Sequence, residues 1–208
     1  FMKRLRKHYE PHKFKYYAVG EYGNICKHGG WTVEPVESIP RCSICRVGRP
    51  HYHACLFNLH FDDFQPVVAG HGDGYWTSPT LEKIWKYGTV QVGEVNFESA
   101  AYVARYCLKK RNGVQADDHY LAFDDDGYLC YLTPEWSVMS RGRRCSEHVG
   151  DPVAALSCNE CTTAIGAEWF AKYVSDVFPS DEVPIPVHGG ERVVRGVPRY
   201  YQELFERT

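Results

Sequence analysis

Two histidines separated by one residue stand at the start of an apolar segment, and this pair constrains the fold more than any other feature. The segment, residues 49–58, reads RPHYHACLFN and has no Gly or Pro after Pro50. Such a run predicts a strand of about eight residues. Because residues two apart on a strand point to the same face, His51 and His53 present two imidazoles side by side. The pair favours two ligands of a metal site. The alternative is a structural pair, with one histidine in the core and the other at its rim.

Length and composition predict one globular domain spanning residues 1–208, since 44% of the residues are apolar. A net charge of -2 excludes a uniformly basic nucleic-acid-coating protein, so contacts with nucleic acid must come from local patches. With no apolar segment of membrane-spanning length and no secretory leader, we expect a soluble intracellular protein. The basic residues cluster at Lys3, Arg4, Arg6, Lys7, Lys13, Lys15, Arg105, Lys109, Lys110, Arg111, Arg141, Arg143 and Arg144.

Hydrophobic spacing and capping residues predict the remaining elements. Helices are expected over residues 1–10, 79–85, 97–111 and 164–177, with Ser78 and Asn96 as N-caps. Strands are expected over 14–22, 89–95 and 128–132, the first carrying Glu21 near its end. Loops are expected over 62–79 and 114–127, insertions over about 24–48 and 141–163, and a Pro-rich tail after the last helix. The first helix has no leading loop, so we expect the chain to be truncated at its N-terminus.

Two tyrosines one helical turn apart mark the expected helix at 97–111. Residues 100–109 read AAYVARYCLK, in which a small, apolar stripe formed by Ala100, Val103, Ala104, Cys107 and Leu108 supplies the packing face. At about 100° per residue, Tyr102, Tyr106, Arg105 and Lys109 lie on the opposite side. Because the stripe is complete without the tyrosines, their face is interpreted as functional.

This combination suits transfer of a phosphodiester to tyrosine. A tyrosine hydroxyl, with a usual pKa near about 10, needs a base, a cation or a metal to become a nucleophile. Lys109 and Arg105 can stabilise the phenolate or the charge on a phosphate under attack. A divalent ion held by His51, His53 and a carboxylate would polarise the phosphodiester. The resulting phosphotyrosine link conserves the bond energy, so the same site can rejoin strands.

The HYH and YVARY motifs together resemble the two-tyrosine branch of the HUH endonucleases, which initiate rolling-circle replication. With the motifs GEYG (20–23), RPHYH (49–53), SPTLE (78–82), GAEWF (166–170) and PSD (179–181), the chain is most similar to the replication initiators of the gokushovirus group of Microviridae. The resemblance implies that Tyr102 and Tyr106 are nucleophiles, and that His51 and His53 bind Mg or Mn with Glu21 as third ligand. It also implies an α+β fold: an antiparallel sheet flanked by helices, with an RRM-like or ferredoxin-like core.

Both insertions lengthen joins that are usually short in this family, and both carry metal-ligand residue types. Four ligands in two close pairs, Cys145, His148, Cys158 and Cys161, predict a structural zinc site in the second insertion. Cys26, His28, Cys42 and Cys45 offer a similar set with an unusual first spacing. A crossed site formed by Cys42, Cys45, Cys158 and Cys161 fits the chemistry equally well, and exposed thiols in variable loops are the non-metal alternative.

These inferences predict an endonuclease that nicks single-stranded origin DNA, becomes linked to the 5' phosphate and leaves a 3' hydroxyl for the host replication machinery, in the cytoplasm of a bacterial host. Aromatic residues Trp31, Tyr75 and Trp76 can stack unpaired bases. Plasmid relaxases and single-strand transposases use the same chemistry and are the near alternative. A non-catalytic, zinc-containing DNA-binding module is the alternative from another class.

Overall fold

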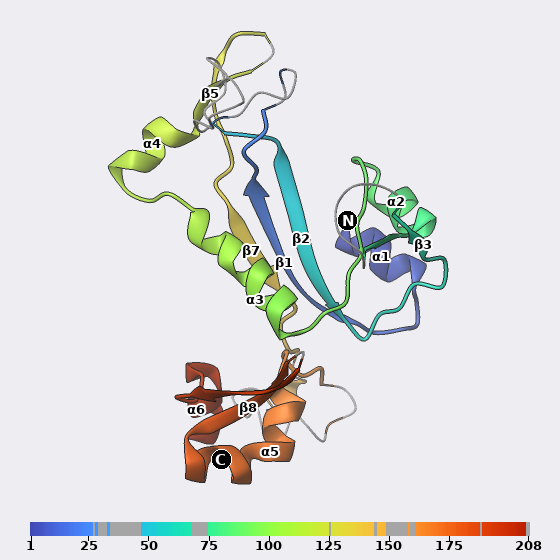
Figure 1. Ribbon diagram of the computed structural model, residues 1–208, viewed down its shortest axis with the longest axis vertical. Helices are drawn as coiled ribbons and strands as arrows, with labels where there is room; N and C mark the ends of the chain where they lie inside the picture. The colour runs from blue at the N-terminus through green and yellow to red at the C-terminus, as the bar shows by residue number, and fades with distance from the viewer. Residues whose placement is uncertain are drawn as a thin grey trace. The chain divides into compact units, whose positions relative to one another are not determined.

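A computed structural model shows a mixed α/β protein with antiparallel sheets and flanking helices, as predicted (Figure 1). The chain divides into two compact units, one formed by Phe1–Tyr16, Leu56–Ser99 and Met139–Thr208 and the other by Tyr17–Cys55 and Ala100–Val138. For His148 and Pro179 only the backbone is described. The structure describes residues 1–26, 28, 33, 47–67, 75–124, 126–143, 145–148, 158, 161–187 and 189–206.

Three strands form the sheet that carries the histidines, in the order β2-β1-β7. The first two, β1 (Lys15–Tyr22) and β2 (Pro50–Phe57), match the predicted strands. The third, β7 (Trp136–Met139), was not predicted. Gly20 allows the Trp136 side chain to lie across β1, because a Cβ at Gly20 would meet the indole Nε1 at 2.6 Å.

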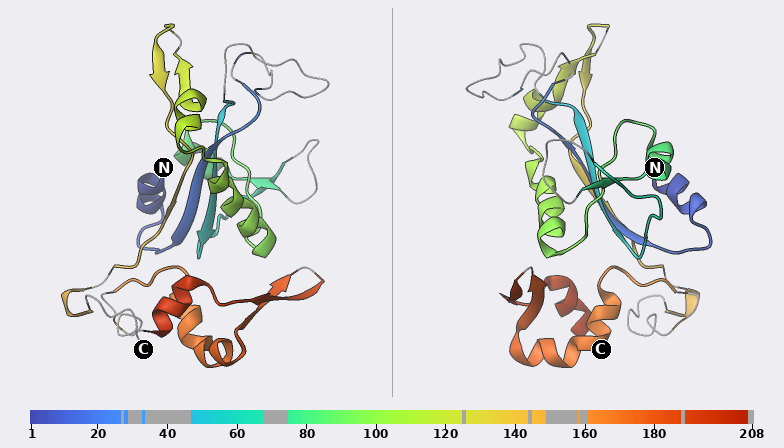
Figure 2. Two further views of the ribbon diagram at one scale, coloured as in Figure 1. Left: turned by 90° about the vertical axis from the view of Figure 1, so that its left-hand side faces the viewer. Right: turned by 45° about the vertical axis from the view of Figure 1, so that its right-hand side comes forward.

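The helix α3 (Phe97–Arg105) lies along one face of this sheet (Figures 1 and 2). Asn96 caps it as predicted: the Ser99 N–H donates to Asn96 Oδ1 (2.8 Å), and the Asn96 N–H donates to Ser99 Oγ (2.9 Å). The α-helix ends earlier than the predicted residue 111 and tightens into the 3-10 turn η1 (Tyr106–Lys109). The predicted packing stripe is wrong at its C-terminal end, because Leu108 is 79% exposed.

The predicted loop over 114–127 is wrong. This part of the chain contains α4 (Val114–Tyr120) and β5 (Leu121–Phe123), and β5 pairs with the predicted strand β6 (Leu129–Tyr131). Tyr120 at the end of α4 is fully buried. Its side chain provides the anchor that the polar sequence around it does not reveal.

The first part of the other unit packs two short helices on one core. Leu5 of α1 (Met2–His8) and Leu81 of α2 (Pro79–Trp85) share this core with Phe14 and Phe61. Ser78 caps α2 as predicted, by accepting a hydrogen bond from the Leu81 N–H. At the other end of α2, the Arg4 guanidinium donates to the carbonyls of Ile84 and Trp85 at 2.8 and 3.0 Å, which satisfies terminal helix acceptors.

The predicted strand over 89–95 is wrong. In this segment the structure has an isolated antiparallel bridge, Trp76↔Val92. Trp76 belongs to β4 (Trp76–Thr77), which pairs with β3 (Gln65–Pro66). A single bridge of this kind leaves the polar faces of residues 89–95 exposed to solvent.

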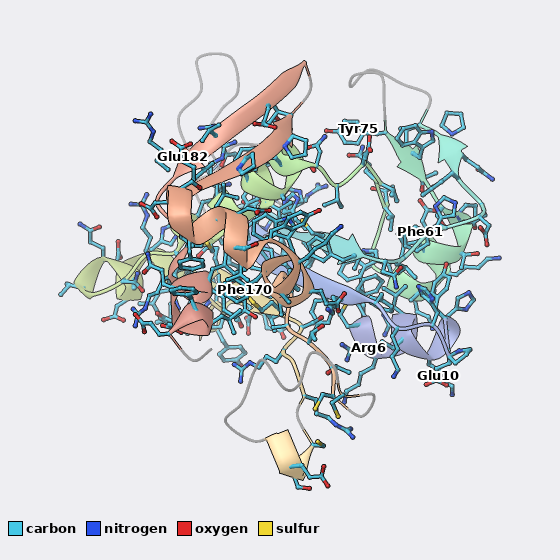
Figure 3. The ribbon with its side chains drawn as sticks, turned by 90° about the horizontal axis from the view of Figure 1, so that it is seen from below. Arg6, Glu10, Phe61, Tyr75, Phe170 and Glu182 are labelled. Carbon is cyan, nitrogen blue, oxygen red and sulfur yellow. The ribbon has the colours of Figure 1, made fainter. Side chains whose placement is uncertain are left out.

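The predicted Pro-rich tail is also wrong. After the predicted helix α5 (Ala167–Ser180), a hairpin of β8 (Glu182–Val187) and β9 (Gly190–Arg195) leads into α6 (Arg199–Phe205). Val177, Val183 and Val197 form the core here, and Phe170 stacks on Tyr201. Figure 3 labels Phe170 among these side chains. No helix in the described part of the chain is long and apolar enough to cross a membrane.

Candidate active site and cysteine cluster

Glu21 lies at the centre of the predicted site, buried beneath the two histidines. The His53 Nε2 is 3.2 Å and the His51 Nδ1 3.9 Å from Glu21 Oε1. The Glu21 side chain is 4% exposed, whereas His51 is half-exposed. The alternating register of β2 therefore places both imidazoles next to the carboxylate of β1, as the strand pattern requires.

Glu21, His51 and His53 offer two imidazoles and a carboxylate, a donor set that suits Mn or Mg. Their three ligand atoms do not all lie within 4.8 Å of one another, although Glu21 is close to both histidines. A metal ion with bonds of about 2.1 Å would hold neighbouring ligand atoms about 3 Å apart. The donors therefore fit such an ion once a histidine ring turns, and half-exposed His51 has the freedom to do so.

Gly23 permits the observed place of the His51 ring. A Cβ at Gly23 would lie 2.5 Å from His51 Nδ1, closer than real Cβ contacts allow. The sequence marks Gly23 only as the end of a strand, so this second task was missed. No signal in the sequence shows which side chain lies over a glycine.

Tyr102 and Tyr106 lie beside the histidines, as predicted. The Tyr106 hydroxyl donates a hydrogen bond to the Tyr102 hydroxyl. The Tyr106 ring stacks on the His53 ring with centroids 4.2 Å apart, while Tyr102 meets His53 edge-on at 6.2 Å. Tyr102 is 53% exposed and Tyr106 is half-buried.

Burial is the main cause that raises the pKa of Tyr106 far above its usual value. The hydrogen bond to Tyr102 and the charge of Glu21 act in the same direction. Without an additional positive charge, the Tyr106 phenol therefore keeps its proton at neutral pH.

Lys109 supplies one positive charge at this place. Its Nζ forms an ion pair with Glu21 Oε2 at 2.5 Å and lies 4.7 Å from the centre of the Tyr106 ring. The predicted cation Arg105 differs, because no hydrogen bond, ion pair or ring contact joins its side chain to another residue of the described ranges. The structure thus brings Lys109 to the carboxylate and leaves Arg105 exposed on the helix.

A buried pair that sequence reasoning missed supports the end of the tyrosine segment. The Tyr120 hydroxyl donates to the Glu135 carboxylate and accepts a hydrogen bond from the Arg111 N–H at 3.0 Å. Both side chains are buried. Burial, with the Glu135 hydrogen bond, raises the pKa of Tyr120 to about 12. Arg111 follows Lys109 by two residues, so the pair fixes the backbone immediately after the site.

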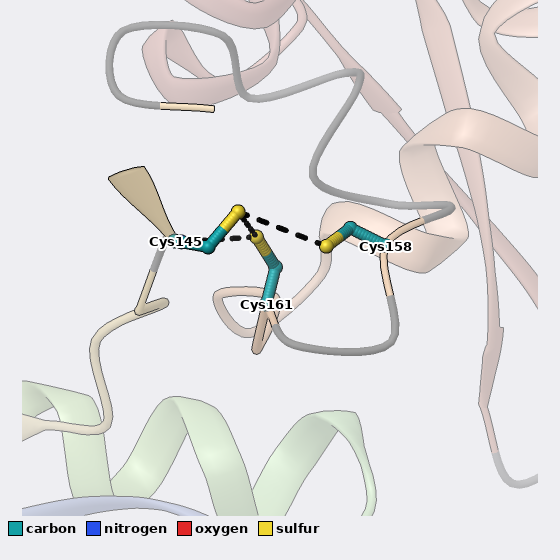
Figure 4. A group of neighbouring side chains, drawn as sticks. All are labelled: Cys145, Cys158 and Cys161. Carbon is teal, nitrogen blue, oxygen red and sulfur yellow. Dashed lines mark hydrogen bonds between the residues drawn. The ribbon is translucent and has the colours of Figure 1, made fainter. Parts of the chain in front are cut away.

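Cys145, Cys158 and Cys161 come together in the other unit and could hold a metal ion such as zinc (Figure 4). Their sulfur atoms lie within 4.8 Å of one another. The His148 side chain lies outside the described part of the structure. Its backbone closes the 3-10 turn η2 (Ser146–His148).

The first cysteine insertion is described only at Cys26 and His28. Cys26 is buried, and the His28 N–H donates to its Sγ at 3.3 Å. The predicted base-stacking residues Tyr75 and Trp76 are 51% and 38% exposed. Four residues singled out in the sequence lie outside the described residues: Trp31, Cys42, Cys45 and Arg144.

Comparison with known proteins adds to this geometry. Residues 43–111, which include the histidine pair and the tyrosine pair, match the ORF2-type family of replication-associated proteins. The chain is 29% identical to the replication-associated protein ORF2 of Spiroplasma virus 4 over its whole length, and 29% identical to the replication-associated protein VP4 of Bdellovibrio phage phiMH2K over 93% of its length.

The matches cover 49% and 44% of those two proteins, so the chain spans about half the length of these curated relatives. A third relative, the replication-associated protein ORF4 of Chlamydia phage 1, is 30% identical over 53% of this chain and 24% of its own length. No solved structure matches the chain.

Proposed function

We propose that this chain, a relative of the phage replication-associated proteins, initiates DNA replication by cutting one strand of origin DNA with a tyrosine. The observation that carries the proposal is the pair of hydrogen-bonded hydroxyls of Tyr102 and Tyr106, set beside His53 and the Lys109–Glu21 ion pair. Histidine and carboxylate donors, a cation and two adjacent nucleophiles are the groups that metal-assisted phosphodiester transfer to tyrosine needs.

In the proposed reaction, a phenol oxygen of Tyr102 or Tyr106 attacks the phosphorus atom of a single-stranded DNA backbone. The bond from phosphorus to the 3' oxygen breaks, and the tyrosine becomes linked to the 5' phosphate. The proton of the phenol passes, in the net reaction, to the 3' oxygen that leaves. The free 3' hydroxyl then serves as a primer for the host replication machinery.

His51, His53 and Glu21 would hold a Mg or Mn ion in this proposal. Such an ion supplies positive charge at the phosphate oxygen and orients the phosphodiester. The residues of the chain have their own tasks. His53 orients the Tyr106 ring by stacking, and Lys109 places an ammonium group next to the phenol whose pKa burial raises.

The two tyrosines give the site a second transfer. One hydroxyl can remain linked to DNA while the other attacks a second phosphodiester, which is the order of events needed to cut and rejoin a strand in rolling-circle replication. The relationship of Tyr102 and Tyr106, one turn apart on one segment, keeps both within reach of the same metal and of Lys109. We place this reaction in the cytoplasm of a bacterial host, and we assign the chain to the HUH endonucleases on the same reasoning.

A labelled single-stranded DNA pool tests the proposal. With Mn present, DNA labelled at its 3' end should become attached to the protein and remain attached in denaturant, because the downstream fragment carries the 5' phosphate. DNA labelled at its 5' end should instead yield a shortened fragment that a polymerase extends.

The double variant Tyr102→Phe with Tyr106→Phe should give neither product. Tyr87→Phe is the matched control, since Tyr87 is exposed and lies in the other unit. Binding of the same DNA pool without attachment or cutting, by a protein that retains its fold, would contradict the enzyme and favour a DNA-binding module.

A further inference from the structure

We infer that Cys145, Cys158 and Cys161 ligate a structural zinc ion that holds together the segment between β7 and α5. The Cys145 sulfur lies 3.9 Å from that of Cys158 and 3.7 Å from that of Cys161 (Figure 4). Four sulfurs around zinc, each bonded at about 2.3 Å, stand about 3.8 Å apart at the corners of a tetrahedron. A disulfide would bring two sulfurs to about 2.05 Å. The observed spacing is therefore that of thiolates around one ion.

The backbone around the cysteines is arranged to support this spacing. Arg143 and Thr162 form an antiparallel bridge in which each N–H donates to the carbonyl of the other, at 2.9 and 2.7 Å. One step further in, the Cys145 N–H donates to the Cys161 sulfur at 3.3 Å. Hydrogen bonds to ligand sulfurs orient metal ligands and stabilise their charge. The bridge thus brings the two ends of the segment together at the sulfur atoms.

No apolar core does this work. Among the described residues from Ser140 to Ala164, no side chain is buried. A segment of this kind cannot be held by the burial of apolar surface, which stabilises the two valine- and leucine-containing cores of the same unit. Zinc stabilises such segments directly, because the ligands come together only when the segment folds.

The ion has a structural consequence beyond its own loop. Thr163 follows the ligand Cys161 by two residues, and its hydroxyl accepts a hydrogen bond from Lys15 Nζ at 2.6 Å. Lys15 also forms an ion pair with Glu168, in the first turn of α5, at 3.1 Å, and the Thr163 hydroxyl donates to the same carboxylate. We therefore expect the zinc ion to set the place of Thr163, and through it the contact between the start of β1 and α5.

The Cys145→Ser variant separates this site from the crossed arrangement in which Cys42 and Cys45 join Cys158 and Cys161. In the full chain, the zinc content measured by mass spectrometry should fall by one equivalent in Cys145→Ser, and the affinity of the remaining site should fall by more than about 100-fold, since even outer partners of metal ligands are worth 10 to 100-fold. Cys130→Ser is the matched control and should keep the zinc content of the wild-type protein. Unchanged zinc in Cys145→Ser would overturn the inference.

A second measurement uses the wild-type chain, so that it does not depend on how a variant folds. Removal of the ion with a chelator should speed amide hydrogen exchange at Arg143 and Thr162 by roughly tenfold or more, because their bridge loses its support. Exchange at Val19, in the middle of β1, should stay unchanged. Equal exchange at Arg143 and Thr162 with and without chelator, or a wild-type chain that binds no zinc, would refute a structural ion. Neither measurement depends on DNA cutting.

Discussion

The imidazole ring of His53 stacks on the phenol ring of Tyr106, with ring planes only 8° apart. The same imidazole lies next to the buried carboxylate of Glu21, and the same phenol lies against Lys109. Two parts of the chain with no sequence proximity, β2 and η1, are thus joined at the two residues to which we assign metal binding and nucleophilic attack. In our proposal His53 therefore orients the tyrosine in addition to binding the metal.

Lys109→Met should slow formation of the protein–DNA link by about 100-fold or more, which is the usual cost of removing one group that stabilises charge in a transition state. The variant removes the ammonium group beside both Glu21 and the Tyr106 ring. Lys110→Met is the matched control, because Lys110 is exposed and adjacent. Single-turnover cutting rates measure the effect, and equal rates in the two variants would rule out a role for Lys109.

Gly23→Ala should weaken Mn binding by roughly tenfold, because the added methyl group displaces the His51 ring from its place beside Glu21. The control Gly93→Ala adds a methyl group where the nearest atom, in the Tyr75 ring, lies at an acceptable 3.4 Å. Titration followed by the electron paramagnetic resonance signal of free Mn gives both affinities. If Gly23→Ala binds Mn as tightly as Gly93→Ala, His51 does not need this position to be a ligand.

Tyr120→Phe should lower the free energy of unfolding by about 1 to 3 kcal/mol, the cost of leaving buried polar groups without a partner. The variant leaves the Glu135 carboxylate and the Arg111 N–H without the hydroxyl that joins them. Urea denaturation at neutral pH measures the difference. Tyr128→Phe, at a largely exposed tyrosine, should unfold at the urea concentration of the wild-type protein.

The same hydroxyl predicts a dependence on alkaline pH. The pKa of Tyr120 is about 12 in the folded protein, against about 10 in an unfolded chain. The folded state therefore retains a proton that the unfolded state loses, and the contribution to stability is present below pH 10 and declines as the pH rises from 10 through 12. The free energy of unfolding should fall less steeply over this interval in Tyr120→Phe. Identical slopes would show that Tyr120 ionises at its usual pKa when folded.

His148→Ala tests the fourth ligand of the inferred zinc site, which the Cys-x-x-His spacing assigns to His148. The variant should keep the three cysteine ligands and bind zinc more weakly, by about tenfold or more. Competition with a coloured chelator measures the affinity. His60→Ala, at an exposed histidine elsewhere in the same unit, serves as control. Zinc affinity equal to that of the control would assign the fourth position to another group.

Elements with local signals were predicted well. Ser78 and Asn96 begin helices because a capping side chain satisfies backbone N–H groups a few residues away, and this chemistry is visible in the sequence. The pairing of β7 with β1 depends on residues far apart in the chain, and β7 has only four residues. Its short length gives too few alternating positions to predict a strand.

Prolines explain why the hairpin after α5 was missed. Pro184 and Pro186 lie in β8, and proline within a strand argues against that assignment because it cannot donate to the ladder. In a sheet of two strands, alternate N–H groups point away from the partner, so prolines two apart can be tolerated on one edge. The number of strands in a sheet is a tertiary property, and the local sequence does not contain it.

The candidate site divides in the same way. The pairing of His51 with His53 and of Tyr102 with Tyr106 follows from strand and helix periods, and Lys109 follows one turn of backbone after Tyr106. The place of Gly23 under the His51 ring and the Tyr120–Glu135 pair could not be predicted. Both depend on which elements pack together, and neither leaves a periodic pattern in the sequence.

The central claim is that Tyr102 or Tyr106 becomes covalently linked to DNA, and one measurement tests it most directly. After reaction with single-stranded DNA and Mn, the linked protein is digested with nuclease and protease, and the modified peptide is sequenced by mass spectrometry. We predict a nucleotide joined through a 5' phosphate to Tyr102 or Tyr106, and to no other tyrosine. A nucleotide on Tyr87 or Tyr128 instead, or cut DNA with no modified tyrosine, would contradict the proposed site.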